Sequence, residues 1–171
     1  MSRIKPAHKY AQGKQLEAEL RWYHAGLESV AGAPRINRLH AAARMGKADS
    51  DFAGHVGPKR VLVEAKEVTS SARFRLDAIE PHQVKALREC HQGGGVAVLV
   101  VRVGGVTWAL GYPALEGAIV RAAVGAGAPG TASLAVADLD RVGARLKGVA
   151  WWGVDLPGWT EPQAGLFGGG V

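Results

Sequence analysis

Apolar positions along the chain follow two different periods. Between Gln12 and Leu27 they recur every three or four residues, as on one face of an amphipathic helix. Residues 51–56 and 60–66 instead have the composition and alternation of strands, and Gly57-Pro58 between them favours a tight turn. The pattern therefore predicts a first helix, ended by Gly32 and Pro34, and then a β-hairpin.

The later part of the chain predicts a sheet that is covered on both faces. Residues 96–101 are an unbroken apolar run rich in valine, which is typical of a central strand buried on both sides. Residues 106–110 are expected to pair with this strand across Gly104-Gly105. Helices are expected at residues 81–91, 113–124 and 137–146. Strands and covering helices in this order indicate an α/β fold.

Several segments lack a clear period. Residues 34–47 place basic side chains among small ones and are predicted to form a basic arm or loop, and residues 69–75 are predicted to form a second loop. We expect a flexible break at residues 125–130. Residues 149–171 combine tryptophans with many glycines, so we predict one domain over residues 1–148 and an irregular tail that docks through its tryptophans.

The net positive charge is confined to the first half of the chain. Residues 1–90 contain 16 Lys and Arg against 10 Asp and Glu, whereas residues 91–171 contain 5 of each, so the first half carries the whole net charge of +6. Such a half suits a phosphate backbone, because neutralised phosphates release counterions, although a solvated basic surface is the alternative. The candidate DNA contacts in the two loops are Arg35, Arg38, Arg44, Lys47, Arg73 and Arg75.

The cysteine content and the sequence of residues 1–9 indicate in which cellular compartment the protein is expected. The single cysteine, Cys90, excludes an internal disulfide and a cysteine-based zinc site, and it suits a reducing environment. No apolar run follows the basic residues 1–9, so neither a signal peptide nor a membrane anchor is indicated. A cytoplasmic protein without a membrane partner is the expectation.

Glu64 and Lys66 carry the chemistry that the sequence suggests most strongly. Alternation puts both on one face of strand 60–66, where charged groups are costly to desolvate. A structural salt bridge is the alternative explanation. The predicted hairpin, however, brings Asp51 beside Glu64. Two carboxylates form a hard oxygen site that suits Mg²⁺, and Lys66 is then placed to orient the attacking water.

This order of an aspartate, a hairpin and a Glu-X-Lys resembles the PD-(D/E)XK nuclease superfamily. Flanking residues are similar to those of the RecU-type Holliday-junction resolvases and extend from Gly13 to about Leu110. The matching segments, in chain order, are Gly13-Lys14-Gln15-Leu16-Glu17, Asp51-Phe52-Ala53-Gly54, Glu64-Ala65-Lys66-Glu67, Phe74-Arg75-Leu76 and His82-Gln83. The resemblance implies a restriction-endonuclease-like fold, in which helices flank a central mixed β-sheet.

The resemblance also implies an activity and a set of site residues. A RecU-type resolvase is a homodimer that binds four-way DNA junctions and makes paired nicks with Mg²⁺ or Mn²⁺, in a bacterial cell whether encoded by the host or by a phage. Asp51 and Glu64 are then the metal ligands, Lys66 the catalytic lysine, Gln83 a residue lining the site and Glu17 an acidic residue nearby. Asp49 is the competing choice for Asp51.

The chain departs from the family pattern at two places. The stretch before Asp51 is shorter and richer in Arg and Ala than the family's junction-penetrating stalk, and the sequence from Thr131 onward matches no part of the family. Two other functions are the alternatives. One is a restriction or repair nuclease of the same fold, which would cut linear duplex, and the other is a DNA-binding module without activity, which would need no divalent metal.

Overall fold

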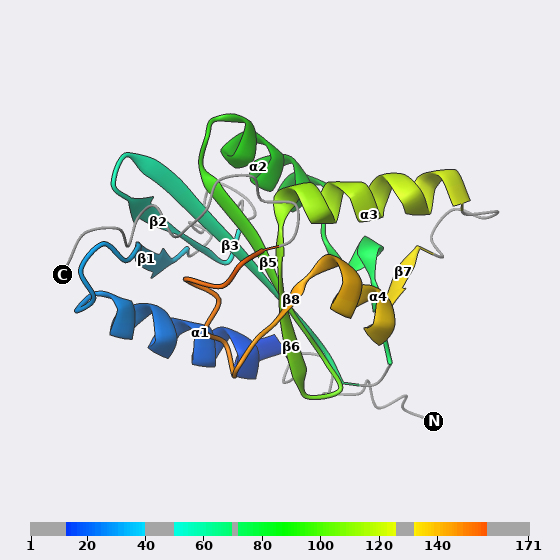
Figure 1. Ribbon diagram of the computed structural model, residues 1–171, viewed down its shortest axis with the longest axis horizontal. Coiled ribbons are helices and arrows are strands. Elements are labelled where there is room, and N and C mark those ends of the chain that lie inside the picture. The colour runs from blue at the N-terminus through cyan, green and yellow to red at the C-terminus, as the bar shows by residue number, and fades with distance from the viewer. Residues whose placement is uncertain (1–12, 40–49, 70–71, 126–131, 157–171) are drawn as a thin grey trace, which may run out of the picture.

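The structure is a computed structural model that describes residues 13–39, 50–69, 72–125 and 132–156 (Figure 1). Its helices and strands, in chain order, are α1 (Gly13–Leu27), β1 (Arg35–Arg38), β2 (Phe52–Val56), β3 (Lys59–Val68), β4 (Arg73–Arg75), the 3-10 helix η2 (Leu76–Ala78), α2 (Pro81–Gln92), β5 (Val96–Val103), β6 (Val106–Gly111), α3 (Tyr112–Gly125), β7 (Ser133–Ala135), α4 (Val136–Val142) and β8 (Ala144–Arg145). None of these helices is long and apolar enough to cross a membrane.

A mixed six-stranded sheet forms the centre of the fold. Its strand order is β1-β2-β3-β5-β6-β8. β3 and β5 run parallel, whereas the other neighbouring strands are antiparallel. Every residue of β5 is buried, as its valine-rich sequence predicts. The predicted α/β class with a central mixed sheet is confirmed.

Two apolar cores lie on opposite faces of the sheet. On one face, Leu16 and Leu20 of α1 pack against Val61 and Val63 of β3. On the other face, Leu87 of α2, Leu115 of α3 and Leu139 of α4 pack with Leu62 and Leu99. Alternate residues of β3 therefore enter different cores, which follows from the period of two in a strand. In Figure 1, α1 lies on one side of the strands, and α2, α3 and α4 lie on the other.

The predicted basic arm begins with a short strand. β1 pairs antiparallel with β2 at the edge of the sheet and buries only Ile36, while Arg35 and Arg38 stay exposed. With only one buried side chain in four, this strand has no hydrophobic period that the sequence could reveal. Charged residues are common on edge strands because they discourage pairing with other chains. Gly54 of β2 allows this close approach, because a Cβ there would collide with the backbone of Arg35.

Two other segments differ from expectation. The loop predicted at residues 69–75 contains β4, which pairs with β7 about 60 positions later in the chain. The helix predicted at residues 137–146 ends earlier, at Val142. Gly143 has extended backbone, and the chain then enters β8 beside β6. Strands of two or three residues are too short to be detected from alternation.

The first residues of the predicted tail belong to the core beneath α1. Trp151, Trp152 and Leu156 are buried there. The indole Nε1 of Trp151 donates a hydrogen bond of 3.0 Å to Nε2 of His24, and the backbone N–H of Trp152 donates one of 3.1 Å to the Tyr23 hydroxyl. Residues 157–171 lie outside the described part of the chain, and the domain boundary at residue 148 stays a prediction.

Candidate active site

The β2–β3 hairpin brings Asp51 and Glu64 together. Phe52 pairs with Val63, so Asp51, one residue earlier, lies across from Glu64. The backbone N–H of Ala65 donates a hydrogen bond of 2.9 Å to Oδ2 of Asp51. The buried Ser50 hydroxyl donates one of 2.8 Å to the carbonyl of Val63. These contacts fix the chain where Asp51 enters β2, and they orient its carboxylate toward β3.

Glu64 is buried completely and uses its two oxygens differently. Oε1 lies 2.7 Å from Nζ of Lys66 and accepts a hydrogen bond of 2.6 Å from Nε2 of Gln83. Oε2 has no hydrogen-bond partner among the described residues. A buried carboxylate oxygen without a donor is costly, so this atom is the one available to a cation.

Gln83 connects the start of α2 to this carboxylate. Its Oε1 accepts hydrogen bonds of 3.0 Å from Nζ of Lys66 and 3.0 Å from the backbone N–H of Glu80. The contact with Glu80 is half of a capping box, and Pro81 occupies the first turn of the helix. The Gln83 amide thus donates through its nitrogen to Glu64 and accepts through its oxygen from Lys66, and these contacts fix the two side chains relative to each other.

Burial and like charge govern the ionisation of Glu64. Desolvation raises its pKa from 4.5 to about 7, the charge of Asp51 adds to this rise, and Lys66 opposes it. Two neighbouring ionised carboxylates, one of them buried, repel each other and destabilise the folded state unless a cation lies nearby. The pair therefore has the chemistry of a divalent-metal site, in which a metal ion would offset this repulsion.

Glu17 lies close enough to Asp51 for the charge of that carboxylate to act on it. Burial and the charge of Asp51 raise the pKa of Glu17, whereas Arg38 and Lys66 lower it. The Glu17 carboxylate also forms an ion pair with Arg38. Within the described residues, no three His, Cys, Asp or Glu side chains are grouped to hold a metal ion. The candidate ligands are the two carboxylates of Asp51 and Glu64, and Glu17 is a neighbouring carboxylate that feels the charge of Asp51.

Three charged residues that the sequence did not single out anchor α1 near the site. Glu67, next to Lys66 on β3, accepts a hydrogen bond of 3.4 Å from the backbone N–H of Leu16. Arg102 on β5 lies against both Glu67 and Glu19 of α1. A charged residue inside the otherwise apolar strand β5 was the available indication, because burying an arginine requires a partner.

The candidate DNA contacts are spread over two edges of the protein. Arg35 donates to the carbonyl of Glu28, and Arg38 binds Glu17. On β4, Arg73 binds Ser133 and Arg75 binds Asp77. All four arginines are exposed. Arg44 and Lys47, like the alternative ligand Asp49, fall in residues 40–49, outside the described residues.

The part of the chain that holds most of this site matches a known family. Residues 31–112 match the family model of recombination protein U, RecU. The match covers 82 of the 171 residues, and this part of the chain is similar to the RecU family. The RecU match includes Asp51, Glu64, Lys66 and Gln83, whereas α1 with Glu17 precedes it. No curated protein sequence matches the chain.

A solved structure supports the assignment of the fold. Hjc from Archaeoglobus fulgidus, described as a Holliday junction resolvase from an archaeal hyperthermophile, superposes with a TM-score of 0.50 at 15% sequence identity. The alignment covers 78% of this chain and 95% of Hjc. At this identity the likeness concerns the fold. The RecU match and the Hjc-like fold agree with the RecU-type resemblance of the sequence.

Proposed function

We propose that this protein is a structure-selective endonuclease that resolves four-way DNA junctions by metal-dependent phosphodiester hydrolysis. The observation that carries the proposal is the pair of facing carboxylates, Asp51 and buried Glu64, with Lys66 bound to Glu64, in a segment that matches RecU. A resolvase of this type works on cytoplasmic DNA as a homodimer, so paired symmetric nicks are part of the proposal.

Asp51 and Glu64 would hold Mg²⁺ or Mn²⁺. When bound, such an ion activates water at neutral pH and stabilises charge on the phosphate. The ligands that the protein supplies are Oε2 of Glu64 and the carboxylate of Asp51, and water and DNA phosphate oxygens suit the remaining positions. Since Glu64 must be ionised to bind the ion, affinity should rise as the pH passes about 7.

Lys66 and Gln83 have separate tasks in this proposal. The Lys66 ammonium group is half-buried and is held by Glu64 and Gln83, so its position is set before DNA arrives. From there it orients the attacking water and donates a hydrogen bond to the phosphate. Gln83 keeps Oε1 of Glu64 occupied, which leaves Oε2 for the metal.

Comparison of two DNA substrates tests the proposal. A labelled mobile four-way junction and a linear duplex of the same sequences are incubated with the protein in Mg²⁺, in Ca²⁺ and in a chelator. We expect rapid cleavage of the junction in Mg²⁺ and binding without cleavage in Ca²⁺, whose looser geometry is unsuited to the reaction. Equal cleavage of the duplex would indicate a restriction or repair nuclease. Junction binding with no cleavage in Mg²⁺ would indicate a binding module.

Substitutions at the site provide a second test of the proposed function. Glu64→Gln and Lys66→Ala should abolish cleavage in Mg²⁺ and leave junction affinity within about twofold, because the basic surface dominates affinity. Glu89→Gln, at an exposed position on α2, is the matched control and should cut as wild type does. Full cleavage by folded Glu64→Gln protein would refute the assignment of the metal site.

A further inference from the structure

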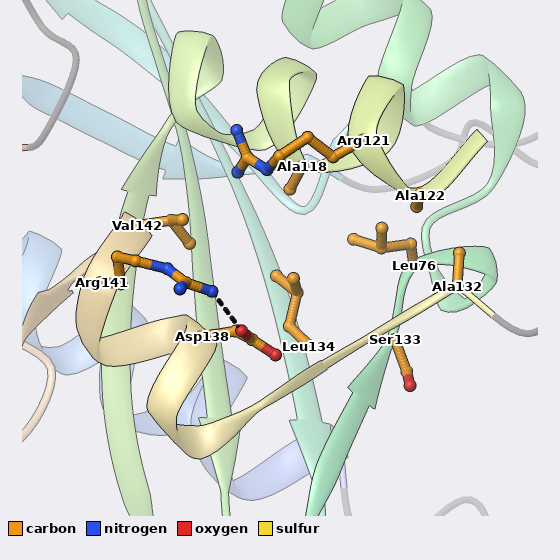
Figure 2. A pocket seen from close by; sticks show the side chains of 10 residues that line it. All are labelled: Leu76, Ala118, Arg121, Ala122, Ala132, Ser133, Leu134, Asp138, Arg141 and Val142. Carbon is orange, nitrogen blue, oxygen red and sulfur yellow. Dashed lines mark hydrogen bonds and ion pairs between the residues drawn. The ribbon is translucent and has the colours of Figure 1, made fainter. Parts of the chain in front are cut away.

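A second concave surface shares no residue with the candidate active site. It is a pocket of about 350 Å³ between α3, α4 and β7 (Figure 2). Apolar side chains line part of it, among them Leu76, Leu134 and Val142. The polar residues of the lining are Arg121, Ser133, Asp138 and Arg141. The pocket therefore offers both apolar contact and positive charge to a ligand.

Two arginines from different helices face this pocket. Figure 2 shows Arg121 lying along α3 and Arg141 extending from α4 toward Asp138, and both arginines line the pocket. Nη2 of Arg141 lies 2.5 Å from Oδ1 of Asp138, which occupies one edge of that guanidinium group. In the described part of the chain, Arg121 has no acidic partner. Two arginines against one aspartate leave the pocket with a net positive charge.

A glycine one turn earlier in α3 makes room for Arg121. A Cβ built on Gly117 would lie 3.2 Å from Nη1 of Arg121. The guanidinium group thus lies back along its own helix, in space that a larger side chain would restrict.

The pocket adjoins a residue already considered for DNA binding. Ser133, which lines the pocket, accepts hydrogen bonds from Arg73: 2.8 Å from Nε to Oγ and 3.2 Å from Nη2 to the carbonyl oxygen. Arg73 on β4 is therefore bound to the strand that forms one wall of the pocket.

Chain connectivity limits how far the pocket lies from the active site. Leu76 lines the pocket, and Gln83 binds Glu64 only seven residues later. Seven residues span at most about 25 Å even when fully extended. One turn of duplex DNA is about 34 Å long. A single DNA arm is therefore long enough to extend from Glu64 to the pocket.

We propose that this pocket binds the sugar-phosphate backbone of a junction arm. Arg121 and Arg141 bind a phosphate through their guanidinium groups, whose planar N–H donors match phosphate oxygens. The apolar side chains of the pocket contact the deoxyribose. The inference rests on the proposed function for the identity of the ligand as junction DNA, and it adds two arginine contacts that lie outside the RecU match.

Salt dependence of binding tests the inference. Affinity for a fluorescent four-way junction is measured by anisotropy in Ca²⁺ between 50 and 200 mM salt (roughly the range over which phosphate contacts weaken). Arg121→Ala and Arg141→Ala should each reduce the salt slope by about one unit. The affinity deficit of each variant should then shrink about three- to fourfold across this range. Arg145→Ala, at an exposed position on β8, is the matched control and should bind as wild type does.

The outcomes separate this inference from the proposed function. If wild type binds the junction and the Arg121→Ala/Arg141→Ala double variant keeps its slope and affinity, the pocket does not bind DNA and the inference is wrong. If wild type fails to bind any junction, the proposed function itself fails. A slope reduced equally by Arg145→Ala would show a general charge effect, which also overturns the pocket assignment.

Discussion

Arg102 on β5 binds Glu19 on α1 through both terminal nitrogens of its guanidinium group, at 3.0 Å from Nη1 to Oε1 and 2.5 Å from Nη2 to Oε2. Its Nη1 also lies 3.5 Å from the buried carboxylate of Glu67. Glu67 follows Lys66, and Glu19 lies two positions after Glu17. The network therefore holds the helix that carries Glu17 against the strand that carries Lys66.

Removal of this arginine should destabilise the protein. Arg102→Ala leaves Glu67 buried without its positive partner, and we expect the free energy of unfolding to fall by about 3 kcal/mol, as for other broken buried pairs. Urea denaturation measures the change. Arg75→Ala, which removes an exposed ion pair with Asp77, is the control and should have no measurable effect. Equal midpoints for Arg102→Ala and wild type would show that the network is dispensable.

Gln83 should matter for rate more than for DNA affinity. Gln83→Ala removes the donor to Glu64 and the acceptor for Lys66, so cleavage should slow at least tenfold, about 1.4 kcal/mol in the barrier, while junction binding is unchanged. Loss of the capping box should lower stability by about 1 kcal/mol. Single-turnover cleavage and denaturation measure the two effects. Gln92→Ala, at the exposed end of α2, is the control; a wild-type rate for Gln83→Ala would contradict the proposed role.

His24 should make stability fall in acid. Burial lowers its pKa from 6.5 to about 4, so its contribution is complete above pH 6.5 and is lost as the pH falls through about 4. The shift corresponds to at most about 3 kcal/mol. His24→Gln keeps an acceptor for Trp151 and cannot titrate, so its stability should change less than that of wild type between pH 6.5 and 4. Thermal unfolding across this range tests the effect. His55→Gln, at an exposed position on β2, should follow wild type. Parallel curves for His24→Gln and wild type would show that His24 does not cause the loss of stability in acid.

A four-way junction has two-fold symmetry, and a homodimer would place one site on each of two strands. Heterodimers of wild-type and Glu64→Gln subunits should therefore nick a supercoiled cruciform plasmid but linearise it poorly. Gel separation of nicked and linear plasmid gives the ratio. Heterodimers of wild-type and Glu89→Gln subunits are the control. Linearisation by the Glu64→Gln heterodimers at the wild-type rate would indicate one site that acts twice in sequence.

The carboxylate pair was predictable from sequence because it depends on local geometry. A tight turn and strand alternation suffice to put Asp51 beside Glu64 and to put Glu64 and Lys66 on one face. The places of Gln83 and Glu17 came from the family resemblance, since no period in the sequence relates a helix terminus to a distant strand. The structure brings all five near one another, and their catalytic roles stay predictions.

The contacts that the sequence did not predict are long-range. β4 and β7 are three residues each and are about 60 positions apart, so neither alternation nor a turn relates them. The pairing of Arg102 with Glu19 spans 83 positions. A pocket formed between two helices and such a strand depends on how the helices pack against the sheet, which a one-dimensional pattern does not contain.

The hydrogen bond from Trp151 to His24 has a consequence for the order of folding. It joins residues 127 positions apart, and most of the chain must be synthesised before α1 is covered on this side. Contacts of such separation form late and slow the folding of a domain. A chain ending before Trp151 would expose the apolar residues around His24 and be open to proteolysis. The segment around Trp151 thus acts as a late-forming cover for α1, and its docking is the step that gives α1 its resistance to proteases.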